Sequence, residues 1–481
     1  MKTLVIAAGS LCAVLSAGAD SIRAVNFANP PSDMRLLPCL NGWNEKAIER
    51  ANAAGFGGAA CSCAWTKDYL RDERDWKGFV SFARQANKAG LSLWLYDEYA
   101  YPSGTAGLET LEGHPELQSR GALVAYEDVE AGAEATVTIP PGNRLGAAAL
   151  PLVEDKVDAS RQREIPLGEG ETLVWRAPEG DAAKWRVCAF TEDAVYTNTH
   201  SQVSFGLNAP YINLLDPRAT KRFIELTHER YAAHFGKDEF SKIFRSTFTD
   251  EPALSHWVRE TPYLFLPCAY DLPDEYRAAT GRDFVRDLPC LSFETVGPEG
   301  PSRRYAYRHI VGERVKRNYF GQIANWCRKH GIWSGGHLFA EEAEAAHASL
   351  YGDFFGCMRA LTAPGMDCLC PYPQKIGPLV PLYASSAADL NGEGAPVMCE
   401  FSDYGRGTNQ PPTRAETIGN AYKLIAGGIT EFTNYHSLRA FKSDAEKRRF
   451  NEIVGRAIAL TKGTRSAADV ALFYPCESIQ A

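Results

Sequence analysis

Short apolar runs alternate with segments of helical spacing along most of this chain, which predicts strands alternating with helices. Helix starts such as Asp216-Pro217 and stops such as Gly55 and Gly90 mark the boundaries. The predicted strands span residues 35–40, 57–63, 91–98, 242–250, 332–337, 365–369, 395–401 and 429–434. Eight strands, nearly all followed by a helix or an insertion, predict an α/β fold of the (β/α)8 TIM-barrel type. The main alternative, a doubly wound open sheet, would need an early glycine-rich phosphate loop, which the sequence lacks.

The alternation changes after Gly121, where short strand candidates are separated by Gly, Pro and Asp turns. These candidates, at 123–126, 135–139, 172–175 and 185–190, predict a small all-β insertion after strand 3. The expected organisation is therefore barrel strands 1–3 in residues 20–120, a β-rich insertion in 121–195 and barrel strands 4–8 in 196–465. Long helices are predicted at 217–235, before strand 4, and at 303–329, before strand 5.

The two ends of the chain carry their own signals. Lys2, an apolar stretch from Leu4 to Ala17 and the small residues before Asp20 have the layout of a signal peptide over residues 1–19. We therefore expect a secreted or periplasmic protein. At the other end, Ala468 to Pro475 predicts a fresh apolar strand, and residues 466–481 are interpreted as the start of a shortened C-terminal segment. Alternatively, residues 472–474 pack against the outside of the barrel.

Composition narrows the function classes. The 481 residues are 45% hydrophobic, enough for one large domain with an insertion. A net charge of −8 argues against nucleic acid and suits a neutral substrate. No stretch after the signal approaches the length of a membrane span, and nothing indicates the oligomeric state. Most of the 13 cysteines lie in apolar runs and are interpreted as small core residues rather than disulfides or zinc ligands.

Polar side chains accumulate at the carboxyl ends of the predicted strands, which is the end where barrel enzymes hold their active sites. Taken singly, each is equally well explained as a solvated loop residue or a cap. They are Asp97 and Glu98 after strand 3, Asp250 and Glu251 after strand 4, His337 after strand 5, Asp367 after strand 6, Glu400 after strand 7, and Asn434 and His436 after strand 8. Their joint occurrence favours one polar site.

Glu251 and Glu400 each end a short apolar run, at strands 4 and 7. If both strands belong to one barrel, the two carboxylates reach the same mouth. A facing pair of carboxylates is the minimum equipment for cleaving a glycosidic bond, since one must donate a proton while the other is ionised.

Several motifs also carry a resemblance. They are Tyr96-Asp97-Glu98 followed by Pro102-Ser103-Gly104-x-Ala106-Gly107, Thr249-Asp250-Glu251-Pro252, Gly336-His337-Leu338 with Glu341, Pro364-Gly365-Met366-Asp367, and Glu400. Over residues 35–475 the chain resembles secreted bacterial glycoside hydrolases of the rhamnosidase-type family 106 and their β-galactosidase-annotated relatives. Thr-Asp-Glu-Pro also resembles the Asn-Glu-Pro signature of retaining glycosidases, with Asp250 in place of Asn. That replacement adds a negative charge beside Glu251, which would tend to raise a carboxyl pKa.

The resemblance implies that Glu251 is the general acid and Glu400 the nucleophile or, in an inverting enzyme, the base. It leaves retention and inversion open, because the rhamnosidases favour inversion and the Asn-Glu-Pro clan favours retention. The remaining polar residues would bind a carbohydrate substrate. They are Asp97, Glu98, Asp250, His337, Glu341, Asp367, Asn434 and His436, with Tyr96 and Trp333 as apolar platforms for a sugar ring. No cofactor or metal is predicted, although the resemblance makes calcium possible.

Two alternatives stay open. A catalytically silent carbohydrate-binding relative would keep the barrel without the activity. A metal-dependent barrel hydrolase would need ligand spacing for which the sequence offers little, His337 with Glu341 being the nearest pair.

Overall fold

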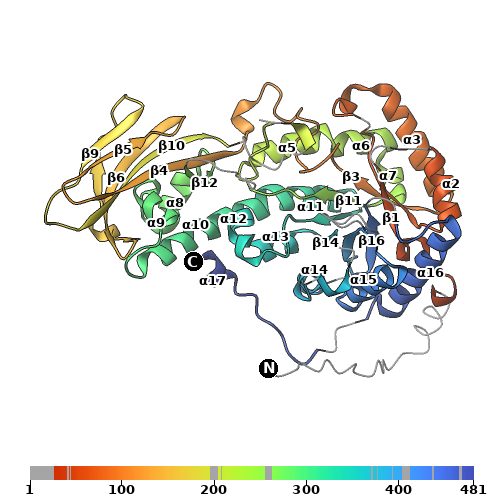
Figure 1. The fold of residues 1–481 in the computed structure, drawn as a ribbon. Coiled ribbons are helices and arrows are strands. Elements are labelled where there is room, and N and C mark those ends of the chain that lie inside the picture. The colour runs from red at the N-terminus through yellow and green to blue at the C-terminus, as the bar shows by residue number, and fades with distance from the viewer. Residues whose placement is uncertain are drawn as a thin grey trace.

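The structure is a computed structural model of the 481-residue chain, shown in Figure 1. It describes residues 26–40, 43, 45–64, 66–195, 204–206, 209–254, 263–369, 372–375, 377–392, 394–403, 412–435, 438–464 and 468–481. The predicted signal peptide, residues 1–19, and His436 lie outside the described residues.

Eight parallel strands of the described chain form one sheet in the order β13-β11-β3-β2-β1-β16-β15-β14. Their bounds are β1 Leu37–Leu40, β2 Gly58–Cys61, β3 Ser92–Tyr96, β11 Phe244–Asp250, β13 Trp333–His337, β14 Gly365–Cys368, β15 Met398–Phe401 and β16 Glu431–Asn434. The two outer strands approach each other through a bridge between Gly335 and Ala363, and the Ala363 amide donates to the Ser334 carbonyl at 2.9 Å. The sheet is therefore a nearly closed parallel barrel, as the strand count predicted.

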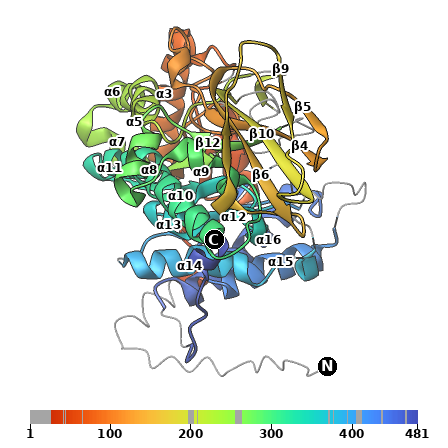
Figure 2. The same ribbon diagram turned by 90° about the vertical axis from the view of Figure 1, so that its left-hand side faces the viewer.

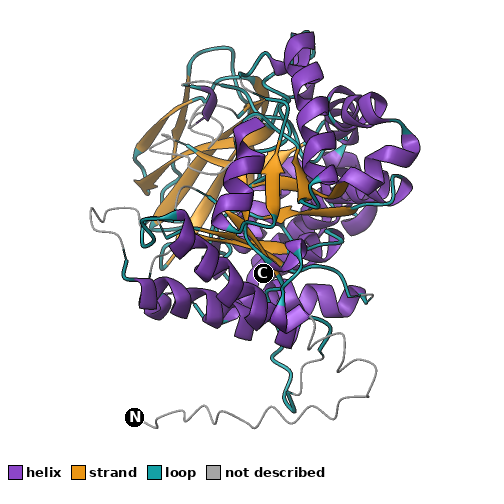
Figure 3. Cartoon of the chain, turned by 90° about the vertical axis from the view of Figure 1, so that its right-hand side faces the viewer, coloured by secondary structure: helices purple, strands orange, loops and turns teal. Residues whose placement is uncertain are grey.

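The two faces of this sheet bury different side chains, because successive residues of a strand point to opposite faces. Leu37, Trp94, Phe248 and Met398 pack together in the barrel interior. The alternate positions, such as Leu93 and Phe401, pack against the surrounding helices. Figure 3 shows these helices around the strands.

Helices surround the barrel strands. The helices around the barrel are α2 Glu45–Ala54, α3 Glu73–Lys88, α5 Pro217–Leu226, α6 His228–Phe235, α7 Lys237–Ile243, α10 Glu299–Val315, α11 Gly321–Lys329, α12 His347–Tyr351, α13 Phe354–Ala360, α14 Leu379–Asn391, α15 Arg414–Ala426 and α16 Asp444–Thr461. The predicted helix 217–235 is interrupted at Thr227, and the predicted helix 303–329 contains a π-helical turn, Lys316–Phe320, between α10 and α11. α14 was not predicted.

A second, antiparallel sheet follows β3 in the chain; it lies at the left-hand end of the molecule in Figure 1 and faces the viewer in Figure 2. Its strands are β4 Arg120–Glu130, β6 Asn143–Val153, β7 Lys156–Val157, β8 Arg163–Ile165, β10 Lys184–Ala194 and β12 Leu264–Cys268, while β5 Glu134–Thr138 pairs with β9 Thr172–Arg176. β12 comes from the segment after β11, which the sequence had indicated as loop and helix; that segment also holds α8 Leu272–Thr280 and α9 Phe284–Ser292. The antiparallel sheet is thus tied to the barrel by two separate stretches of chain.

The strand predicted at 468–475 is wrong. These residues pair with no strand, and they lead into the short helix α17, Cys476–Gln480. Tyr474 packs among His347, Phe354 and Tyr383 on the outside of the barrel. Because β16, the last barrel strand, pairs with β1, it offers no free edge to which residues 468–475 could pair as a further strand.

None of the helices in the described part of the chain combines the length and apolar character that crossing a bilayer requires.

Candidate active site

Strand register brings four polar side chains to the same end of the barrel interior. Asp250 at the end of β11 pairs with His337 at the end of β13, and Asp367 of β14 pairs with Glu400 of β15. Asp250 and Glu400 each stand two residues after an interior side chain, Phe248 or Met398, and His337 and Asp367 are their register partners, so all four point inward. The convergence of strands 4, 5, 6 and 7 that the sequence predicted is present.

His337 lies at the centre of this group. Its Nε2 lies 2.8 Å from Oε2 of Glu400 and 3.3 Å from Oδ1 of Asp250, and its Nδ1 donates to the Leu338 carbonyl at 2.9 Å. Glu341 Oε1 lies 3.6 Å from Nδ1 and accepts the backbone N–H of Asp367 at 3.1 Å. One imidazole therefore links three carboxyl groups, and all four residues are buried.

A second set of hydrogen bonds fixes Asp250. The Tyr96 hydroxyl donates to Asp250 Oδ2 at 2.5 Å, and the Tyr96 ring stacks on Phe248. Ser103 Oγ accepts the Asp250 amide at 2.8 Å and donates to Asp97 Oδ1 at 2.7 Å. The loop after β3 thereby holds the strand that carries Asp250 and Glu251.

Glu251 follows Asp250 with a backbone φ of +49°, in the left-handed region that a side chain with a Cβ rarely adopts. Strained residues of this kind are concentrated at functional sites. Burial, reinforced by the charge of Asp250, raises the pKa of Glu251 well above its ordinary value, while His337 opposes the shift. The raised pKa favours the protonated form of Glu251, which is the form that a general acid requires.

Burial also shifts the pKa values of the other carboxyl groups of the cluster. Burial raises the pKa of Glu400, Glu341 and Asp367, and the hydrogen bond from His337 works against that rise at Glu400 and Glu341. Burial lowers the pKa of His337, but hydrogen bonds to Asp250, Glu341 and Glu400 outweigh it, so the pKa lies well above its ordinary value. The carboxyl groups around His337 thus favour its protonated form, and a protonated His337 in turn favours the ionised form of Glu400.

The same three side chains could hold a cation. One ligand atom each of Asp250, His337 and Glu400 lie within 4.8 Å of one another. Because Nδ1 of His337 donates to a carbonyl, Nε2 faces the two carboxylates with either a proton or a lone pair, and the lone pair would need a metal ion between them. An imidazole in the set suits zinc or a similar transition metal better than calcium, which prefers oxygen ligands.

Comparison with known proteins places the fold. No protein-family model and no curated protein matches the chain. The fold is shared with a rhamnosidase. This solved structure, from Novosphingobium sp. PP1Y, superposes with a TM-score of 0.59 at 13% sequence identity, over 92% of this chain and 61% of that one. At that identity the likeness shows a glycosidase-like fold only, and the chain spans about three fifths of the rhamnosidase's length.

Other predicted site residues lie away from the cluster. Glu98 is fully buried, and its carboxylate accepts backbone N–H groups of Tyr99, Thr105, Ala106 and Gly107, so it holds its own loop. Asp97 points to the outer face of β3, one residue out of phase with Tyr96.

Two more predicted residues also lie elsewhere. Trp333 begins β13, four residues before His337 and roughly 13 Å along the strand. Asn434 pairs with Phe401 and Pro38, out of phase with Glu400, so it points away from the barrel interior and donates to the Phe401 carbonyl at 3.0 Å.

Sequence reasoning missed the roles of Ser103 and Tyr319. Ser103 was visible inside the Pro-Ser-Gly block, but its link between Asp97 and Asp250 depends on the loop's return to β11. Tyr319, from the π-helical turn, reaches Thr249 Oγ1 at 3.0 Å and the Ser103 carbonyl at 3.3 Å. Nothing in the sequence around Tyr319 signals this contact.

Proposed function

We propose that this protein is a glycoside hydrolase that removes terminal sugars from oligo- or polysaccharides by a two-carboxylate mechanism. Glu251 is the general acid, and Glu400 is the nucleophile or the base that activates water. The observation that carries the proposal is the arrangement at the carboxyl ends of the strands: the pKa of Glu251 is raised well above its usual range, while Glu400 Oε2 lies 2.8 Å from Nε2 of His337, a group whose raised pKa favours the protonated form. The rhamnosidase-like fold supports the choice of substrate class.

In this mechanism Glu251 gives its proton to the glycosidic oxygen as the bond to the anomeric carbon breaks. Glu400, as a carboxylate, either attacks that carbon or takes a proton from a water molecule that does. His337 keeps Glu400 ionised and correctly oriented, while Tyr96 and Asp250 form part of the wall against which the sugar lies. Asp367 and Glu341 are placed to accept hydrogen bonds from sugar hydroxyls.

The experiment begins with a screen of nitrophenyl glycosides, rhamnosides and galactosides first. On the substrate found, Glu251→Gln should lower kcat on a poorly leaving alkyl glycoside by about 10²- to 10⁴-fold, the usual contribution of a general acid. On a dinitrophenyl glycoside, whose leaving group needs no proton, the loss should be much smaller. Glu400→Gln should abolish turnover of both substrates.

The matched control is Glu342→Gln, an exposed acid beside Glu341 that should leave the rates unchanged. Melting temperatures of all variants show whether a loss of rate is a loss of folding. An unaffected rate in Glu251→Gln on the alkyl glycoside, or in Glu400→Gln on either substrate, would reject the assignment.

A second candidate is a metal-dependent hydrolase, which the Asp250, His337 and Glu400 cluster favours. It predicts that a chelator removes activity and that zinc or manganese restores it, whereas the two-carboxylate enzyme is indifferent to chelation. A silent carbohydrate-binding relative would instead be stabilised by sugar without hydrolysing it at any pH.

We also propose that residues 1–19 are removed on export, so that the mature chain starts near Asp20. Expression in a bacterial host followed by N-terminal sequencing of the periplasmic protein tests this, and a retained Met1 would contradict it.

A further inference from the structure

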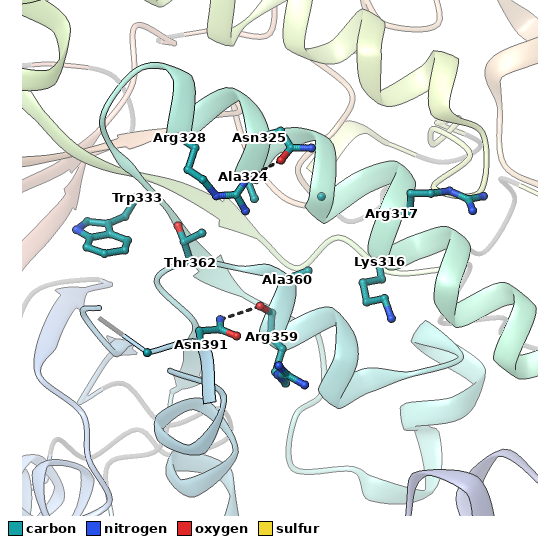
Figure 4. A pocket seen from close by; sticks show the side chains of 12 residues that line it. Lys316, Arg317, Ala324, Asn325, Arg328, Trp333, Arg359, Ala360, Thr362 and Asn391 are labelled. Atoms are coloured by element: carbon teal, nitrogen blue, oxygen red, sulfur yellow. Dashed lines mark hydrogen bonds between the residues drawn. The ribbon is translucent and has the colours of Figure 1, made fainter. Parts of the chain in front are cut away.

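A pocket of about 520 Å³ lies at the amino ends of β13 and β14, the opposite end of the strands from the carboxylate cluster. Helices α11, α13 and α14 each contribute residues from their last turns, and Trp333 and Thr362 stand where the two strands begin (Figure 4). A volume of this size fits a small ligand. We call it the basic pocket, lined by Lys316, Arg317, Gly321, Ala324, Asn325, Arg328, Trp333, Arg359, Ala360, Thr362, Asn391 and Gly392.

The lining has four cationic side chains and no acidic one. This is unexpected in a chain whose 59 acidic residues outnumber its 51 basic ones. Lys316 has an ion pair with Glu313, but among the described residues Arg317, Arg328 and Arg359 form no ion pair with a carboxylate. Cations gathered in a concave surface without counter-charges create a positive potential that attracts anions.

The cationic groups differ in where they point. In Figure 4, Arg328 extends toward the centre of the pocket and is hydrogen-bonded to the Asn325 side chain, Lys316 lies across the pocket from it, and the side chains of Arg359 and Arg317 extend away from the centre. Guanidinium groups present a planar set of donors that matches the oxygens of a carboxylate, phosphate or sulfate. Arg328 is therefore the group best placed to hold such an anion, and the exposed Arg359 at the rim can reach it by a change of rotamer, with Lys316 as a third charge.

Hydrogen bonds hold the wall of the pocket between these groups in place. Thr362 Oγ1 accepts the Ser334 amide at 2.7 Å, and Ser334 Oγ accepts the Thr362 amide at 3.0 Å. The Asn391 side chain donates to the Arg359 carbonyl at 2.8 Å and to the Leu361 carbonyl at 3.2 Å. A wall fixed in this way loses little freedom when a ligand binds, which favours affinity.

The π-helical turn adds an independent observation. Lys316–Phe320 is a single π-helical turn, a costly element that recurs at functional sites. Its first residues, Lys316 and Arg317, line the basic pocket, whereas Asn318 donates inward to the Leu215 carbonyl at 2.8 Å. The π-helical winding thus places Lys316 and Arg317 at the pocket and the neighbouring Asn318 in the core.

We propose that the basic pocket binds a small ligand through an oxyanion group, a carboxylate, phosphate or sulfate, held by Arg328, Arg359 and Lys316. The site is separate from the carboxylate cluster, so the proposal does not rest on the proposed activity.

Isothermal titration of the full chain with inorganic phosphate, sodium sulfate and D-glucuronate, in a low-salt buffer free of these anions, tests the proposal. We expect saturable binding of at least one of them, weakened by added salt, and none of uncharged glucose. Tightest binding of glucuronate would identify an acidic sugar as the ligand type, and tightest binding of phosphate or sulfate would identify an ester of that acid. Arg328→Gln and Arg359→Gln should each weaken binding about tenfold, the equivalent of one charge-assisted hydrogen bond.

Lys329→Gln is the matched control, because Lys329 follows Arg328 on the same helix, is exposed and does not line the pocket. It removes the same charge and should change the affinity by less than about twofold. No saturable binding of the three anions below about 10 mM, or an equal loss in Lys329→Gln and Arg328→Gln, would overturn the proposal. Because the substituted side chains are exposed, unchanged melting temperatures are expected throughout.

Discussion

His337 sets the charge balance of the carboxylate cluster. It is the only cationic side chain among the described groups that contact Asp250, Glu341 and Glu400 there, and its raised pKa reflects all three contacts. A buried imidazole whose pKa is raised by several carboxyl groups has a consequence for stability as well as for catalysis.

Replacement of His337 by Gln should therefore destabilise the protein in a pH-dependent way. The pKa of His337 is raised on folding, so its stabilisation is fully present below the unfolded value near 6.5 and is lost as the pH rises through the folded value. The gap in the free energy of unfolding between wild type and variant should thus be largest near pH 6 and shrink at alkaline pH. Urea unfolding at several pH values measures it. A gap that grows toward alkaline pH would contradict the assignment, and the exposed His114→Gln should show no gap.

Asp97 and His228 form a buried pair whose protonation follows from hydrogen-bond directions. Thr227 Oγ1 donates to the Phe223 carbonyl, so it must accept from Nδ1 of His228 at 2.8 Å. Nε2 of His228 then carries a lone pair, 3.7 Å from Asp97 Oδ2, and burial lowers the pKa of His228 to about 3. Burial also raises the pKa of Asp97 well above its ordinary value, which favours the neutral acid with its proton on the side of His228.

Asp97→Asn should therefore be tolerated, because an amide can also donate to His228 and accept from Ser103. We expect a loss of less than about 1 kcal/mol, against about 3 kcal/mol for Asp97→Ala, which leaves buried polar groups unpaired. Urea unfolding at pH 7 compares the two variants. Equal losses would show that Asp97 is ionised in the native protein.

At the scale of elements, the close approach of β11 and β13 positions the cluster. Gly336 has a φ of +130°, and a Cβ there would lie 2.0 Å from the Thr249 carbonyl oxygen. Only glycine allows the two strands to carry Asp250 and His337 at hydrogen-bonding distance.

Gly336→Ala should accordingly destabilise the protein by about 3 kcal/mol or more, through backbone strain and steric overlap together. Gly331→Ala is the control, since its φ of +69° brings strain but its nearest contact is an ordinary 3.5 Å; it should cost about 1 kcal/mol. Thermal or urea unfolding measures both. A smaller loss at Gly336 than at Gly331 would contradict this account of the strand pair.

The elements also show what sequence could predict. Strand ends such as Asp250 and His337 were predictable, because a buried parallel strand is an apolar run that stops at a polar residue. The π-helical turn and β12 were not, since a π turn keeps the apolar spacing of an ordinary helix and β12 contains a proline, Pro267. Trp333 and Asn434 were predicted to lie at the active-site end of the barrel because one is aromatic and the other polar. That prediction ignored the position of each residue along its strand, which decides the end and the face of the sheet on which its side chain lies.

At the scale of the whole molecule, the fold separates two regions of opposite charge. The carboxylate cluster lies at the carboxyl ends of the strands and the basic pocket at their amino ends, with the interior residues Trp94, Phe248 and Met398 between them. The barrel gives each region a rigid frame, while the antiparallel sheet stands to one side (Figure 1).

The most direct test of the central claim is the pH dependence of kcat/KM for wild type and Glu251→Gln on the poorly leaving alkyl glycoside, whose cleavage needs the proton of the general acid. Wild type should show a bell, with an acid limb from Glu400, which must be ionised, and an alkaline limb from Glu251, which must be protonated. Glu251→Gln should keep the acid limb and lose the alkaline one. An alkaline limb unchanged in Glu251→Gln would contradict the account, because another group would then be the acid.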